Sequence, residues 1–155
     1  MTPAGSGLFP VLDSMDNWAP KWLRREFIRD EKLDPDVPMW EPRQNFVARG
    51  ESTTNRRVAC FQLDGVPIAK RFYWLVFEAQ DVDICAQDPG HEVDLWIFAN
   101  MRTHIEIWLG HIPMAKALGL GQLRLDGPSS EIKAFHKWFC LSHFAEDGQR
   151  LTAAS

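Results

Sequence analysis

The chain has 155 residues, of which 45% are hydrophobic and 25% are charged, and its formal net charge is −4. This length and composition predict one globular domain and exclude extensive low-complexity sequence. The negative charge gives no overall attraction for nucleic acid or an anionic membrane. Three cysteines, no signal-peptide pattern and no apolar stretch long enough for a bilayer predict a soluble, cytoplasmic protein with reduced thiols.

The N-terminal segment predicts a helix of about two dozen residues. Thr2 and Pro3 suit a helix start, because threonine caps free amides and proline is tolerated at the first helical position. Apolar residues then recur every three or four positions, and Pro10 and Pro20 are expected to bend or interrupt the helix. These apolar residues are Leu8, Val11, Leu12, Met15, Trp18, Trp22 and Leu23.

Residues 31–55 predict a connector before a run of strands. Around the prolines at 35, 38 and 42 the connector has room for a short helical turn that carries Met39 and Trp40, and the pattern of residues 43–47 is ambiguous. Residues 58–63 and 72–79 are rich in β-branched and aromatic side chains and flank a turn, which predicts an antiparallel pair. Alternation over 82–86 and 93–99 predicts two further strands with one buried face each.

The last third of the chain predicts helices around a final strand. Asn100 is expected to cap a helix over 101–109, a short helix follows over 114–118, and a strand follows at Leu123 and Leu125. Ser129 or Ser130 is expected to cap the last helix, and residues 146–155 are predicted to be disordered. The order of elements predicts an α+β fold with a mainly antiparallel sheet.

Two groups of histidines are candidates for ligand chemistry. His136, Cys140 and His143 would share one face of the last helix, as zinc ligands do, but that face is apolar and favours simple packing. His104 and His111 flank Trp108, where a histidine could orient a polar ligand group at a pocket entrance. For His104 and His111, an exposed position at the end of the helix is the favoured interpretation.

The acidic pairs do not predict catalysis. Asp81 with Asp83, and Glu92 with Asp94, are two residues apart, so each pair would lie on one solvated strand face. The sequence has no phosphate-binding loop, nucleophile elbow or kinase signature. The prediction is therefore a protein that is not an enzyme, with no catalytic residues, no metal and no cofactor.

Residues 88–139 resemble the sterol carrier protein type-two domain. The matching features are the DPG turn, the strand EVDLWIFA, a helix ending in WLG, the short helix MAKAL, the segment GQLRLDGP and an amphipathic last helix. The chain is more closely similar to the version found at the C-terminus of some HxlR-type winged-helix regulators of bacteria. There a segment like LDPDVPMW precedes the sheet, and a helix beginning TPAG closes the winged-helix module.

This resemblance implies a domain organisation. Residues 1–30 would be an N-terminal helix like the end of a winged-helix module, 31–55 a connector, 56–145 the sterol-carrier-like domain and 146–155 a tail. The DNA-reading part is missing, so no sequence-specific nucleic-acid binding is expected. The helix would supply a homodimer seam, with packing against the chain's own sheet as an equal alternative. The seam residues would be Val11, Met15, Trp18 and Trp22.

The resemblance also implies a five-stranded sheet, covered by helices, with a hydrophobic tunnel for a fatty acyl chain, acyl-CoA or sterol-like ligand. Strand parity places Trp96 and Phe98 on the face opposite Leu95 and Ile97. The alternative is a non-catalytic dimerisation or interaction module whose tunnel is filled by aromatic side chains. The expected ligand-binding walls are Trp96, Phe98, Ile105, Trp108, Leu109, Leu118, Phe135, Trp138 and Phe139.

Overall fold

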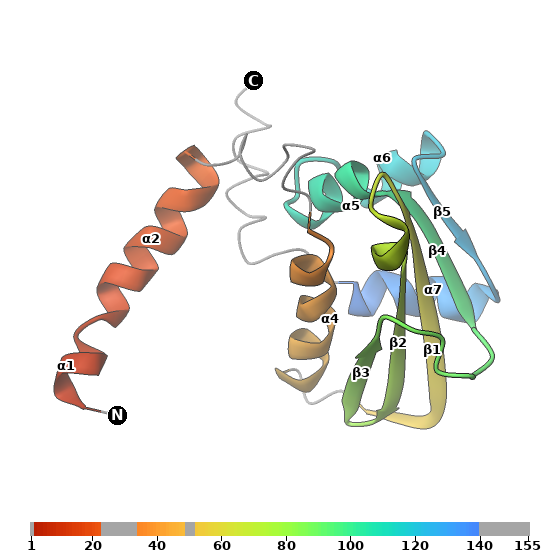
Figure 1. Cartoon of the computed structure of the whole chain (residues 1–155), viewed down its shortest axis with the longest axis horizontal. Helices are drawn as coiled ribbons and strands as arrows, with labels where there is room; N and C mark the ends of the chain where they lie inside the picture. Colours follow the sequence, from red (N-terminus) through yellow and green to blue (C-terminus); the bar gives the residue numbers. More distant parts are fainter. Residues whose placement is uncertain (1, 23–33, 49–51, 140–155) are drawn as a thin grey trace.

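The structure, a computed structural model, describes residues 2–22, 34–48 and 52–139 (Figure 1). Helices α1, α2 and α4 come first, five strands and the short helices follow, and a last helix ends the described chain. The helices are α1 (Pro3–Ser6), α2 (Phe9–Trp22), α4 (Asp36–Ala48), η2 (Ile68–Lys70), α5 (Met101–Trp108), α6 (Met114–Gly119) and α7 (Ser129–Trp138). The strands are β1 (Thr53–Asp64), β2 (Phe72–Ala79), β3 (Asp81–Cys85), β4 (Leu95–Asn100) and β5 (Leu123–Asp126).

The five strands form one sheet in the order β3-β2-β1-β4-β5. The pair β1 and β4 is parallel, and the other three neighbouring pairs are antiparallel. The prediction of an α+β fold with a five-stranded, mainly antiparallel sheet and an N-terminal helix is confirmed. None of the described helices is long and apolar enough to cross a membrane.

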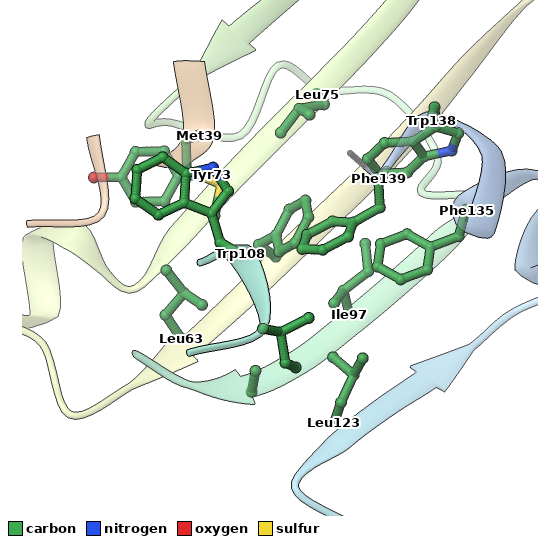
Figure 2. Close-up of a cluster of buried hydrophobic side chains, with 14 of the residues drawn as sticks. Met39, Leu63, Tyr73, Leu75, Ile97, Trp108, Leu123, Phe135, Trp138 and Phe139 are labelled. Atoms are coloured by element: carbon green, nitrogen blue, oxygen red, sulfur yellow. The ribbon is translucent and has the colours of Figure 1, made fainter. Parts of the chain in front are cut away.

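One face of the sheet, called the inner face here, carries the hydrophobic core. Alternate residues of the strands, such as Phe61, Leu75 and Ile97, are fully buried on it. Helices α4, α5 and α7 contribute apolar side chains to the same buried cluster, and Figure 1 shows α7 passing behind the strands. Period-two strands and amphipathic helices therefore meet in one layer of side chains (Figure 2).

The other face, called the outer face here, is partly covered by the connection from β3 to β4. Since β2 and β1 lie between those strands, residues 86–94 must pass over them, as Figure 1 shows. Asp94 fastens the connection to β1, because its backbone N–H donates to the Val58 carbonyl and its carboxylate accepts from the Val58 N–H. Burial, with a smaller contribution from the charge of Asp88, raises the pKa of the Cys60 thiol to about 12.

Helix α4 corrects the expectation of a connector with only a short helical turn. It has 13 residues and contains Pro42. Two of its residues, Met39 and Phe46, are buried in the core, so tertiary burial outweighs the helix-breaking tendency of proline. The Tyr73 hydroxyl also donates to the Asp36 carboxylate at 2.5 Å and fastens the start of α4 to β2.

The N-terminal helix is interrupted, as its prolines suggested. Thr2 Oγ1 accepts from the Gly5 N–H, so Thr2 caps α1 as expected, and α2 begins only at Phe9. Pro20 lies within α2 and does not end it. Figure 1 shows α2 lying apart from the sheet and its covering helices.

Two capping predictions have different outcomes. Asn100 caps α5, since its side-chain oxygen accepts from the Arg102 N–H at 3.0 Å. The prediction that Ser129 or Ser130 caps the last helix is wrong, because the N-cap residue of α7 is Pro128 and no side chain bonds there. Both serines lie inside the first turn, and the Pro128 carbonyl accepts from the N–H groups of Glu131 and Ile132.

Arg57 joins β1 to the start of α7. Its guanidinium donates twice to one carboxylate oxygen of Glu131, at 2.8 and 2.5 Å. We expect Glu131→Gln to lower the free energy of unfolding by about 1–2 kcal/mol, because a partly buried charge-assisted bond is lost. Urea unfolding measures the change. Lys133→Gln, on the exposed side of α7, is the control, and an equal loss in that variant would contradict the role of the pair.

Candidate functional site

His104 lies inside a cage of aromatic side chains. It belongs to α5, and only 2% of its surface is exposed. Its imidazole meets the ring of Phe61 edge-on at 5.4 Å and the ring of Phe139 edge-on at 5.6 Å. Phe135 contacts both of these rings, at 6.4 and 5.0 Å between centroids. We call Phe61, His104, Phe135 and Phe139 the His104 cluster.

The imidazole of His104 is neutral and incompletely bonded. Its Nε2 atom is buried and has no hydrogen-bond partner among the residues that the structure describes. Burial lowers the pKa of His104 from 6.5 to about 4, because the apolar rings disfavour the charged form. The expected exposed position at a helix end is therefore wrong. His104 follows the buried Met101 by one turn and precedes the buried Trp108 by another, so it shares their apolar face.

Most of the expected ligand-binding walls come together on the inner face. Figure 2 shows Trp108, Phe135, Trp138 and Phe139 in the layer between the sheet and the helices. Ile105 and Leu109 are buried in the same cluster, and Leu118 packs against it. The Trp108 indole N–H donates to Glu41 of α4, so a polar partner satisfies this buried ring.

One small cavity of the described residues lies between β1, β4 and α7. Its volume is about 10 Å³, and Val58, Phe77, Leu95, Glu131 and Trp138 contribute to its lining. This volume holds about one water molecule. A larger ligand at this cavity needs side chains of its lining, such as Trp138, to move aside.

The other two expected walls, Trp96 and Phe98, lie on the outer face, as strand parity required. They are half-buried and stack on each other at 6.1 Å. Phe72 and Trp74 of β2 form a second stacked pair at 5.7 Å. The sequence reasoning did not choose Phe72 and Trp74, although the same two-residue alternation along β2 would have indicated them.

Strand register arranges these aromatics as two rows across the sheet. Trp74 and Trp96 are the partners of Cys60 on either side, and Phe72 and Phe98 are the partners of Gln62. The central strand thus carries small or polar residues between aromatic neighbours. We call these six residues the aromatic face. Beyond it, the guanidinium of Arg124 lies 3.8 Å from the centre of the Phe98 ring, as in a cation–π contact.

The structure describes only some of the residues considered for metal or acid–base chemistry. His136 is exposed, and Cys140 and His143 lie outside the described residues. In the described part of the chain, no group of three or more metal-ligating side chains forms. Asp81 pairs with Arg43, and this bond, helped by the Val82 N–H, lowers the pKa of the Asp81 carboxyl.

The fold has counterparts among solved structures. A variant of the sec-alkyl sulfatase PisA1 matches 72% of this chain, with a TM-score of 0.57 and 12% identity. The UbiJ-SCP2 ubiquinone synthesis protein matches 84% of this chain and 94% of its own, with a TM-score of 0.42 and 15% identity. Sterol Carrier Protein 2 Like 2 from Aedes aegypti matches 67% of this chain and 98% of its own, with a TM-score of 0.45 and 10% identity.

The match to the sulfatase describes a shared fold alone. The chain spans 17% of the sulfatase chain, so nothing about that enzyme's activity follows for this protein. The two lower TM-scores support no conclusion about function. No protein-family model matches the chain, and no curated protein matches it either.

Proposed function

We propose that this chain is a non-enzymatic domain that binds one small apolar or amphipathic molecule between its sheet and helices α5 and α7, beside His104. The observation that carries the proposal is the buried, unpaired Nε2 atom of His104 within an aromatic shell. Fatty acyl, acyl-CoA and sterol-like molecules are the ligand classes to test.

An unpaired polar atom in a core needs a reason. Leaving a buried donor or acceptor unsatisfied costs about 1–3 kcal/mol, which an apolar side chain of similar shape would avoid. A ligand oxygen at Nε2 would recover that loss. Because the imidazole is neutral, it suits a hydroxyl or a carbonyl, depending on which nitrogen carries the proton. The surrounding phenylalanines would add about 25 cal/mol for each Å² of ligand removed from water.

The route to His104 runs past Phe139. This residue follows α7, has an extended backbone, and its N–H donates to the Phe135 carbonyl. Moving the Phe139 side chain would open the cluster without breaking the helix. Trp138, the last residue of α7, contacts Phe135 at 5.0 Å and would report the change by fluorescence.

The ligand test compares hexadecanol, palmitic acid and hexadecane, which differ in one polar end. We expect the alcohol and the acid to bind with affinities about tenfold above that of the alkane, because only they can pair with Nε2. Native mass spectrometry measures the bound ligand, and tryptophan fluorescence follows the titration. In His104→Phe the difference between the three should disappear, whereas His136→Phe, an exposed position on α7, should keep it.

Three results would contradict the proposal. If none of the three molecules binds or changes the fluorescence, ligand binding between the sheet and the helices is wrong. If all bind equally to the unchanged protein, the core binds apolar molecules but His104 does not select them. If His136→Phe also abolishes the difference, the effect does not come from Nε2.

A dimerisation or interaction module is the second candidate, as the sequence suggested. The observation that favours it is the apolar side of α2, where Val11, Met15 and Trp18 each expose more than half of their surface. The side chain of Trp22, the fourth expected seam residue, is outside those the structure describes. The kinship of this helix with a winged-helix regulator stays a prediction. Sedimentation over a range of concentrations tests the module, and a monomer throughout would argue against it.

A further inference from the structure

The N-terminal helices present apolar side chains that nothing in the described chain covers. Leu8 precedes α2, and Val11, Leu12, Met15 and Trp18 follow at helical spacing, with 51–60% of each residue exposed. Residues three and four apart share one side of a helix. We call these five residues the helix stripe. Contiguous apolar surface of this kind marks an interaction site in soluble proteins.

The aromatic face is a second apolar surface on the same chain. Its four rings are half-buried, and none of them belongs to the main buried cluster of the inner face. The crossover at 86–94 covers the neighbouring end of the sheet, where Val58 and Val76 are buried. Helices α4, α5 and α7 pack on the inner face. None of these three helices therefore covers the aromatic rows.

We infer that the helix stripe of one copy of this chain packs on the aromatic face of a second copy, and that the exchange is reciprocal. Reciprocal packing makes a two-fold symmetric dimer, which is closed and does not extend into a filament. A helix would then cover each face of the sheet, which is a common way for a sheet with two apolar faces to bury both.

The two surfaces match in chemistry. The helix stripe runs from Leu8 to Trp18, about 15 Å along the helix axis. The aromatic face spans three neighbouring strands, about 10 Å across the sheet. The stripe offers mainly aliphatic and Met side chains to flat rings, a combination that packs closely. Arg124, beside Phe98, would keep its polar end at the edge of the contact.

The contact area is sufficient for a stable dimer. The five side chains of the helix stripe remove roughly 500 Å² from water on the helix, and the rings of the aromatic face, already mostly buried, lose roughly 250 Å². Two reciprocal contacts then bury roughly 1,500 Å², within the range for standard stable interfaces. A single contact would bury about half as much and would be weak. Reciprocity is therefore part of the inference.

This inference is independent of ligand binding at His104. It extends the second candidate function, because it names the surface that receives the helix. A dimer formed by two helices packing on each other would satisfy that candidate without involving the sheet. The decisive variants therefore alter the two surfaces separately.

The test uses Met15→Glu on the helix stripe, Phe98→Gln on the aromatic face, and Ile68→Glu as control. Ile68 is 82% exposed and belongs to neither surface. Sedimentation velocity over a hundredfold range of concentration measures association, and circular dichroism checks folding. We expect the unchanged chain and the control to dimerise, and each of the other two variants to dimerise at least tenfold more weakly. Mixing these two variants should restore part of the association, because a mixed dimer keeps one intact contact.

Each other outcome overturns the inference. A monomer at all concentrations removes the dimer and with it the second candidate function. If Met15→Glu weakens the dimer but a folded Phe98→Gln variant does not, the helices pack on each other. The dimer then exists, but the aromatic face does not receive the helix stripe. If mixing restores nothing, the contact is not reciprocal. A Trp96→Gln variant replaces Phe98→Gln if the latter fails to fold.

Discussion

Replacing Phe135 with alanine is expected to lower the free energy of unfolding by about 3–5 kcal/mol. Phe135 is fully buried, and its ring contacts those of Phe61, Trp138 and Phe139 at 6.4, 5.0 and 5.0 Å. Removing it takes away the apolar transfer energy and leaves a cavity that α7 and β1 cannot close completely. Guanidinium unfolding, followed by tryptophan fluorescence, measures the loss.

Ile68→Ala is the matched control for Phe135→Ala. The Ile68 side chain is 82% exposed, so its truncation should change the free energy of unfolding by less than about 0.5 kcal/mol. A loss below about 1.5 kcal/mol for Phe135→Ala would mean that α7 does not pack on the sheet as described. The denaturant dependence should stay unchanged, since a change in it would indicate an altered unfolded or native state.

The stability of the protein is expected to fall as the pH falls from about 6.5 to about 4. The pKa of His104 is about 4 in the folded protein, against 6.5 when unperturbed. Above both values the imidazole is neutral in both states, so His104 causes no pH dependence there. Between them the unfolded chain takes up the proton first, which favours unfolding. The loss between pH 7.5 and pH 4.5 should be about 2–3 kcal/mol from this residue.

A variant isolates the contribution of His104 from that of the carboxylates that also titrate in acid. Unfolding by urea is measured at both pH values for the unchanged protein, for His104→Phe and for His136→Phe. The first variant should lose about 2–3 kcal/mol less than the unchanged protein between the two pH values. The second, at an exposed position, should behave as the unchanged protein does. Equal losses in all three would show that His104 ionises as it does in the unfolded chain.

The strands were predictable because their pattern has a period of two. Strand β2 runs from Phe72 to Ala79, as predicted, and the two-residue alternation alone separated Trp96 and Phe98 from the inner core. The predicted start of β4 at 93 was two residues early, since β4 begins at Leu95. Conversely, the polar residues from Thr53 to Arg57 extend β1 beyond its expected start. Thr53 and Arg57 pair with Ala79 and Phe77 of β2, and the register shifts between them, so backbone pairing extends the strand whatever the side chains are.

Other parts of the structure depended on contacts between distant segments. The local sequence does not predict α4, because its prolines disfavour a helix. Tertiary contacts stabilise it, namely the burial of Met39 and Phe46 and the bond from Tyr73 to Asp36. The cage around His104 brings together residues of β1, α5 and the end of α7. A histidine beside a helix end looks exposed until the elements that enclose it are in place.

The sequence by itself determined the α+β class, the alternating strands and the amphipathic sides of the helices. These features depend on spacing along the chain, and the geometry of helices and strands converts spacing directly into faces. Only the tertiary structure decided that β4 lies parallel to β1 and that the imidazole of His104 is buried, neutral and without a partner among the described residues. Those properties depend on which distant segments meet in the core, because burial and pairing there fix the pKa of a buried group.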